Sequence, residues 1–197
     1  SINFVQGLYK IFDEVIVNSA DQVERVNTLI KNGGKHEKRV TEIRVTIDKD
    51  SFCVKNNGNG IEIEFDEEEQ MYTPTLIFGV LLTSSNYDDE VKRTIGGTNG
   101  YGAKLANIFS KYFRVRTQDH KTNQVFEQIW ENNMTKRNRH KLWKGNHKFD
   151  DDKKGYTGTE FYVEPDFSKF GVKHLARDMI ALFKRRVYDT AATTPKT

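Results

Sequence analysis

Three groups of residues in this sequence have types and spacings suited to holding a charged ligand and acting on it. The first group is Glu14, Asn18 and Asp21, which follow one another at intervals of four and three residues. On a helix these intervals place all three side chains along one stripe. A carboxylate there can orient and deprotonate a water molecule, and an amide oxygen can hold a hard cation such as Mg²⁺. Taken alone, the spacing is more typical of a solvated helix face.

The second group is the run Asn56-Asn57-Gly58-Asn59-Gly60, which directly follows a segment of alternating apolar and polar residues. Two glycines separated by one residue let the backbone turn sharply and let another molecule approach closely. An Asn-Gly pair is also a common hairpin turn, so this run alone does not distinguish a turn from a binding loop.

The third group is the strongest local signal, the run Gly96-Gly97-Thr98-Asn99-Gly100-Tyr101-Gly102-Ala103-Lys104. Its four glycines open onto a predicted helix, which would aim free backbone N–H groups at an anion, with Lys104 near the same helix end. The run lacks the Gly-Lys-Ser/Thr of a Walker A loop, and no strand leads directly into it, as a Rossmann fingerprint requires. A flexible hinge is the alternative interpretation.

Hydrophobic periodicity predicts the elements that must position these groups. Thr73 is expected to cap the second helix, with Pro74 in its first turn. Helices are predicted over about 4–30, 73–82, 101–113 and 172–189, and strands around 43–47, 52–54, 61–65, 115, 125–130 and 161–163.

This order of elements predicts an α/β fold of the α+β kind, a two-layer sandwich. Hairpins argue against an all-parallel doubly wound sheet, so we expect helices on one face of a mixed, largely antiparallel sheet. Cys53, Trp130 and Tyr188 are expected to pack inside it.

Composition excludes several classes of protein. No apolar run approaches the roughly 20 residues that cross a bilayer, and no signal peptide is visible, so an intracellular location is expected. The single cysteine excludes an internal disulfide framework and a multi-cysteine zinc site. The five histidines show no metal-ligand spacing, and the net charge of 31 − 28 = +3 is too small to establish a polyanionic partner.

The three groups occur in this order within one chain, a combination much rarer than any one of them. With them, the sequence resembles the ATPase domain of eukaryotic-type type IIA DNA topoisomerases. That domain belongs to the GHKL class, with its Bergerat ATP-binding fold, which also includes gyrase B, mismatch-repair ATPases and heat-shock chaperones. The resemblance is weakest at 31–40 and 135–155, two charge-rich segments for which it suggests no function. It is carried by residues 10–18, 56–61, 81–89, 97–110, 130–134 and 185–189.

The resemblance implies roles for individual residues. Glu14 would be the general base for attack of water on the γ-phosphate of ATP, and Asn18 would hold Mg²⁺. Asn56 would accept a hydrogen bond from the adenine amine, where the wider class often has Asp. Thr98 departs from the arginine more usual at its position. The remaining implied ATP-binding residues are Asn57, Gly58, Gly60, Ser84, Ser85, Asn86, Gly97, Thr98, Asn99, Gly100, Tyr101, Gly102, Ala103 and Lys104.

The resemblance also implies an activity, that of the ATP-operated gate of a type II DNA topoisomerase. Binding of Mg·ATP would close a homodimer around double-stranded DNA. Residues 1–197 are expected to form one GHKL-type domain, a fragment without the N-terminal arm, the transducer or the DNA-cleavage core. Such a fragment would bind ATP, hydrolyse it weakly and leave DNA uncleaved. It would act in the nucleus if cellular, or in a host cell or virion if viral.

Two alternatives remain open from the residues alone. The chain could be another GHKL-class ATPase, a chaperone or a mismatch-repair protein. It could also be a non-enzymatic nucleic-acid-binding module whose glycine runs are only hinges. The segment from Lys136 to Lys148 favours the second alternative, because it holds six Lys or Arg residues, no acidic residue, and Trp143.

Overall fold

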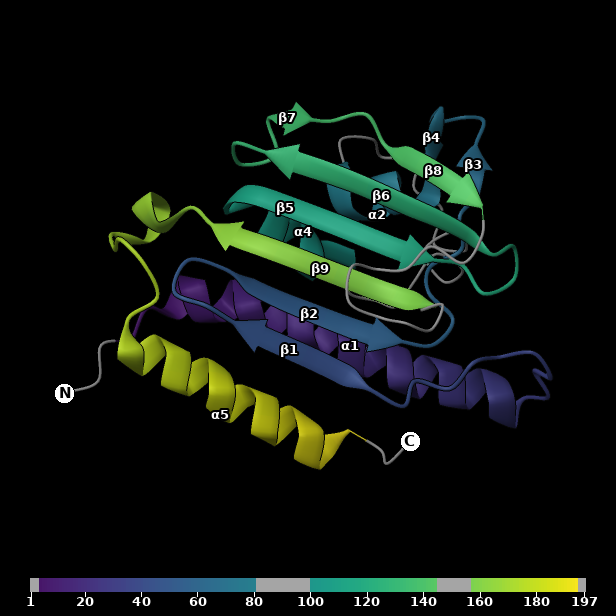
Figure 1. The fold of residues 1–197 in the computed structure, drawn as a ribbon, viewed down its shortest axis with the longest axis horizontal. Helices are drawn as coiled ribbons and strands as arrows, with labels where there is room; N and C mark the ends of the chain where they lie inside the picture. The colour runs from purple at the N-terminus through teal and green to yellow at the C-terminus, as the bar shows by residue number, and fades with distance from the viewer. Residues whose placement is uncertain (1–3, 81–99, 145–156, 195–197) are drawn as a thin grey trace.

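One layer of strands with helices along one side makes up the part of the chain that the computed structural model describes, residues 4–80, 100–144 and 157–194 (Figure 1). The helices are α1 (Gln6–Lys31), α2 (Thr73–Gly79), α4 (Gly100–Ile108) and α5 (Arg177–Thr193), with a 3-10 turn at Phe167–Phe170. The strands are β1 (Ile43–Ile47), β2 (Phe52–Asn57), β3 (Phe65–Asp66), β4 (Met71–Tyr72), β5 (Ser110–Gln118), β6 (Gln124–Glu131), β7 (Lys136–Arg137), β8 (Lys141–Lys144) and β9 (Gly158–Pro165).

The main sheet has the strand order β1-β2-β9-β5-β6-β7, with β8 also paired to β6. Every strand pair in the described residues is antiparallel, so the predicted mixed sheet is antiparallel throughout this part. Strand β9 enters from late in the sequence and lies between β2 and β5. As a result Asn57, Gly158 and Gln118 lie in register at one end of the sheet, which we call the loop end.

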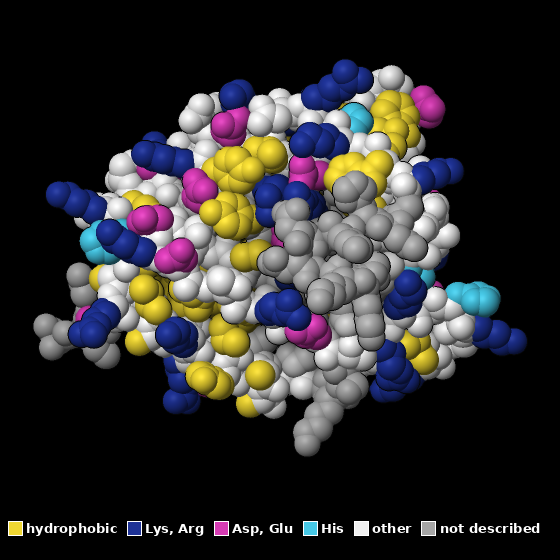
Figure 2. Space-filling view, viewed as in Figure 1, with side chains coloured by type: hydrophobic (Ala, Val, Ile, Leu, Met, Phe, Trp, Pro, Cys, Tyr) yellow, Lys and Arg dark blue, Asp and Glu magenta, His cyan; other side chains and the backbone are white. Residues whose placement is uncertain are grey.

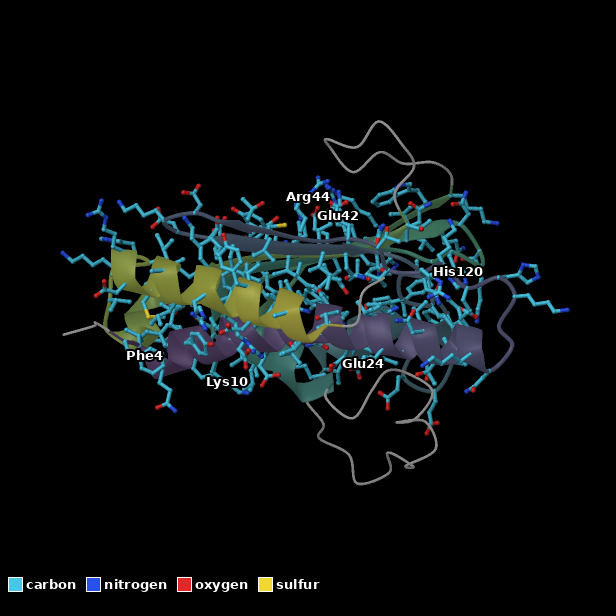
Figure 3. All side chains as sticks on the ribbon, turned by 90° about the horizontal axis from the view of Figure 1, so that it is seen from below. Phe4, Lys10, Glu24, Glu42, Arg44 and His120 are labelled. Atoms are coloured by element: carbon cyan, nitrogen blue, oxygen red, sulfur yellow. The ribbon has the colours of Figure 1, made fainter. Side chains whose placement is uncertain are left out.

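The core lies between the sheet and the helices. Every second residue along the strands points toward α1. Phe52, Val54 and Phe113 are examples, and all three are almost completely buried. From α5, the Phe183 ring stacks on Phe12 of α1 with 4.0 Å between ring centroids. Figure 3 shows the resulting two layers edge-on, with the helices on one side of the sheet. The predicted two-layer architecture is therefore confirmed.

The opposite face of the sheet carries no helix in the described residues, and Figure 2 shows charged and apolar side chains intermixed on it. Cys53 belongs to this face rather than to the core, which corrects the sequence prediction, because alternation along β2 turns it away from Phe52 and Val54. Tyr188 is 74% exposed on α5, so its predicted packing is also wrong, whereas Trp130 is buried as expected.

Several predicted element boundaries are wrong. The strand predicted at 61–65 is reduced to the short β3, and α2 begins at Thr73 itself, with Tyr72 as its N-cap. The helix predicted to end at 113 ends at Ile108, because the chain enters β5 at Ser110. The last helix begins at Arg177 instead of 172, after the 3-10 turn. No helix of the described part is both long and apolar enough to cross a membrane.

Candidate functional site

The contact between α1 and α4 is built around Glu14. A Cβ atom placed on Gly102 would lie 1.7 Å from Glu14 Oε2, so only glycine allows the first turns of α4 to come this close to the carboxylate. The Glu14 side chain is 17% exposed. The glycine predicted to approach an anion thus first makes room for the candidate general base.

Lys10 holds the same carboxylate from one helical turn earlier. Its Nζ lies 2.5 Å from Glu14 Oε1, and this hydrogen bond to Glu14 raises the pKa of the Lys10 ammonium above its usual 10.5. The pair fixes one carboxylate oxygen, so Lys10 orients Glu14. Sequence reasoning missed this residue, although the i, i+4 spacing of Lys10 and Glu14 was visible.

Asn18 lies one turn beyond Glu14, on the predicted stripe. Its amide nitrogen donates to the Glu14 backbone oxygen at 2.7 Å, which leaves the amide oxygen as the atom the side chain can offer a cation. Within the described residues, no group of three or more His, Cys, Asp or Glu side chains could hold a metal ion. A cation here would need further oxygen ligands from a bound ligand or water. Asp21 lines a shallow groove between α1 and α5.

The loop from Asn56 to Gly60 lies at the loop end of the sheet. Asn56 continues the helix-facing side of β2 and is 2% exposed. Gly60 has φ 71°, and a Cβ there would lie 2.0 Å from the Gln118 backbone oxygen. Gly58 has φ 122° and is confined by Val40. Both glycines are therefore required by backbone conformation and by space.

Asn57 is not brought to the same side as Asn56. Its side-chain oxygen accepts from the backbone N–H groups of Thr41 and Glu42 at 2.8 and 3.0 Å, and its amide nitrogen donates to Thr41 Oγ1 at 2.7 Å. Successive strand residues point to opposite faces, so the sequence neighbour of Asn56 serves a different contact.

The glycine-rich run is described only from Gly100 onward. Gly100 and Tyr101 form the first residues of α4, followed by Gly102, the buried Ala103 and Lys104. Lys104 is 9% exposed, and burial lowers the pKa of its ammonium from the usual 10.5. The other predicted residues of the lid, Ser84, Ser85, Asn86, Gly97, Thr98 and Asn99, lie outside the described residues.

Thr117 and Gly158 complete the loop end, and sequence reasoning missed both. The Thr117 hydroxyl accepts from the Ile61 backbone N–H at 2.8 Å and donates to the Gly158 oxygen at 3.1 Å. A Cβ on Gly158 would lie 2.0 Å from the Asn56 backbone oxygen. No local pattern could have identified them, because the pairing of β2 with β9 joins positions more than a hundred residues apart.

Two cations in the described part of the basic segment, residues 136–144, form ion pairs within the domain. Lys136 pairs with Glu131 at 2.7 Å, and Lys141 pairs with Glu127 at 3.2 Å. Burial alone would raise the pKa of Glu127, but the Arg116 and Lys141 cations hold it below its usual 4.5. These cations are therefore engaged within the domain, which weakens the interpretation of this segment as a nucleic-acid-binding patch.

The comparisons with known proteins agree with this fold. None of the protein-family models matches the chain. The chain is 46% identical over 194 residues to DNA topoisomerase 2 of Penicillium chrysogenum, covering 98% of this chain and 11% of that protein. It superposes on the crystal structure of the ATPase region of Saccharomyces cerevisiae topoisomerase II with a TM-score of 0.77 and 40% identity, covering 99% of this chain and 47% of that one.

Over nearly its whole length, the chain is similar to the ATPase regions of DNA topoisomerase 2. The fold extends to the 43K ATPase domain of Thermus thermophilus gyrase B, which is 20% identical with a TM-score of 0.61, covering 90% of this chain and 39% of that one. That likeness shows the shared GHKL fold alone. The chain spans about a tenth of the length of the curated topoisomerase 2 relative and just under half of the yeast ATPase region.

Proposed function

We propose that this domain binds ATP with Mg²⁺ between α1, the Asn56–Gly60 loop and the N-terminus of α4. The observation that carries the proposal is that α1 touches both other parts. Glu14 packs against Gly102, and two turns later the Gln22 amide contacts the Gly60 oxygen at 3.5 Å. Eight residues of helix span about 12 Å, a length suited to an extended nucleoside triphosphate.

The proposed roles follow from the chemistry of each group. Asn56 would accept from the adenine amine at the loop end, and the backbone N–H groups that begin α4 would bind phosphate oxygens. Asn18 would offer its amide oxygen to Mg²⁺, which when bound neutralises phosphate charge. Glu14, held by Lys10, would take the proton of the attacking water.

The proposed lid completes the site. Ser84, Ser85, Asn86, Gly97, Thr98 and Asn99 would contact the ribose and phosphates, as the resemblance implies. The buried Lys104 ammonium would supply a cation near the phosphates, and Gly58 would let the base approach. Asn57 is left out of the ligand-contacting set, because its side chain is engaged by Thr41 and Glu42.

At the scale of the whole protein, we propose an ATP-operated gate of a type II DNA topoisomerase, the activity named by the relatives. ATP binding would close a homodimer on double-stranded DNA. We place this activity in the nucleus rather than in a virion, since the similar proteins come from the cellular organisms Penicillium chrysogenum and Saccharomyces cerevisiae. A chaperone or mismatch-repair role is disfavoured, because over 98% of the chain the similarity is to a topoisomerase 2.

Calorimetric titration with a non-hydrolysable ATP analogue and Mg²⁺ tests nucleotide binding. The wild type is expected to bind saturably, and Asn56→Ala to bind at least about tenfold more weakly, because a buried base-recognition bond is lost. Asn138→Ala is the matched control. The Asn138 amide donates to Glu131 at 2.8 Å, and Glu131 lies at the end of β6 that is far from the loop end, so this variant should bind like the wild type. No binding by the folded wild type, or an Asn56→Ala variant that binds normally, would refute the proposal.

A further inference from the structure

The charge-rich segment after α1 lies along the Asn56–Gly60 loop, and we call residues 37–42 the strap. The strap leads into β1, and its Glu42 backbone oxygen accepts from the Asn57 N–H at 3.2 Å, one step beyond the register pair Ile43 and Asn56. The Asn57 side chain then replaces further ladder bonds by accepting from Thr41 and Glu42. Side-chain amides therefore extend the β1–β2 pairing past its last strand residue.

Asn59 makes the second attachment of the strap. Its side-chain oxygen accepts from the Lys38 backbone N–H at 2.7 Å, and its amide nitrogen donates to Glu37 Oε2. Asn59 is 5% exposed, so neither bond is easily replaced by water. Both the side-chain oxygen and the side-chain nitrogen of Asn59 are therefore bonded to the strap.

Val40 inserts the strap into the interior. It is 1% exposed and packs with Val23 and Val26 of α1 in a small apolar cluster. A Cβ on Gly58 would lie 2.7 Å from Val40 Cγ2. The strap thus contacts both the loop and the helix that carries Glu14.

The far side of the loop is held by the ends of β5 and β9. The Asn59 backbone oxygen accepts from the His120 N–H at 2.9 Å and lies 3.1 Å from His120 Nδ1, and the Gly58 N–H donates to Thr157 at 3.1 Å. His120 Nε2 lies 3.6 Å from Glu37 Oε2, so the same strap residue is reached from this side. The loop is clamped between the strap and the sheet.

We propose that Asn59, acting through Glu37 and the strap, is a positioning residue that sets the affinity of the nucleotide site by fixing the loop that carries Asn56. The inference rests on the proposed function, because it concerns the same site. It gives a role to a charge-rich segment for which the resemblance suggests none. Asn59 itself would touch no ligand.

Exchanging the donor and the acceptor of the Asn59–Glu37 hydrogen bond tests this role. In Asn59→Asp the side chain keeps an acceptor for the Lys38 N–H but sets a second carboxylate against Glu37. Binding of the non-hydrolysable ATP analogue is expected to weaken about tenfold. Adding Glu37→Gln supplies an N–H donor to the new carboxylate, so the double variant should return to within about threefold of the wild type, with Glu37→Gln alone nearly neutral.

Asn27→Ala is the matched control, because Asn27 accepts a hydrogen bond from the strap residue Arg39 at 3.2 Å and has no bond to the loop. The affinity of this variant for the ATP analogue should equal that of the wild type. Thermal melts of each variant separate loss of fold from loss of affinity. Failure of the wild type to bind would overturn the proposed function and this inference with it. Wild-type binding that Asn59→Asp leaves intact, or a loss that Glu37→Gln does not restore, would overturn the inference alone.

Discussion

Single residues of the site are fixed by close contacts rather than by exposure to a ligand. Gly102 is required by the Glu14 carboxylate, and Gly60 by the Gln118 backbone oxygen. Lys10 and Asn18 bond to the side chain and the backbone of the same glutamate. These contacts hold Glu14 in one orientation before any ligand arrives, which lowers the cost of assembling a catalytic site.

Residue types could be read from the sequence, but their side-chain directions only in part. The α1 stripe was predictable because helix periodicity alone fixes it. The opposite directions of Asn56 and Asn57 follow from strand alternation, yet the partner of Asn57 does not, because the strap had no recognisable pattern. Gly158 could not be assigned, since only the insertion of β9 between β2 and β5 brings it to the loop.

Cys53 gives a test that depends on pH. Burial, with the Glu160 carboxylate nearby, raises the pKa of its thiol from the usual 9.0 to about 11. The folded state therefore holds this proton more tightly than the unfolded state, so its contribution to stability is full below pH 9 and is lost as the pH rises toward about 11. At pH 8, iodoacetamide should alkylate the folded protein more than about tenfold more slowly than the urea-unfolded protein.

Cys53→Ala supplies the control for this measurement, because any label it still takes up comes from other side chains. Equal alkylation rates in the folded and unfolded wild type would show that the thiol is not protected in the way described.

Among the elements, α1 and α5 form the helix layer beneath β1 and β2. Two different interactions join them, the stacked rings of Phe12 and Phe183 and the ion pair between Asp13 and Arg186 at 2.5 Å. The Phe183 ring also meets Phe52 of β2 edge-on at 6.0 Å between centroids. Because Asp13 precedes Glu14, α5 supports the part of α1 that presents the candidate base.

The packing of the helix layer predicts that two aromatic residues on α5 contribute very differently to the free energy of unfolding. Phe183→Ala should lower the free energy of unfolding by about 3–5 kcal/mol, since its side chain is completely buried. Tyr188→Ala should change it by less than about 0.5 kcal/mol, because that ring is 74% exposed. Urea unfolding followed by circular dichroism measures both, and similar losses for the two variants would contradict this packing.

Long periodic elements could be predicted from the sequence, and short or abruptly ended ones could not. The apolar stripe of α1 and the β1–β2 hairpin were clear. The end of α4 at Ile108 was missed because Phe109, Tyr112 and Phe113 continue a helix-like spacing beyond it, so periodicity gives no stop. The start of α5 was predicted five residues too early, at 172 instead of Arg177, and the 3-10 turn at Phe167–Phe170 was not predicted.

At the scale of the whole molecule, the loop end gathers parts of the chain that are distant in sequence. Residues from α1, the strap, β2, β5 and β9 meet there, and the open face of the sheet is covered instead by paired charges such as Arg114 with Glu160 at 2.9 Å. The antiparallel topology therefore brings these parts together at the end of the sheet where we propose that the nucleotide binds.

Hydrogen exchange of the wild type, with and without Mg²⁺ and a non-hydrolysable ATP analogue, tests this account most directly. Saturating analogue should slow exchange of the backbone amides at 56–62 and 100–108, with little change in β6–β8. Exchange that the analogue leaves unchanged, or protection confined to β6–β8, would contradict the central claim that α1, the Asn56–Gly60 loop and the start of α4 form one nucleotide site.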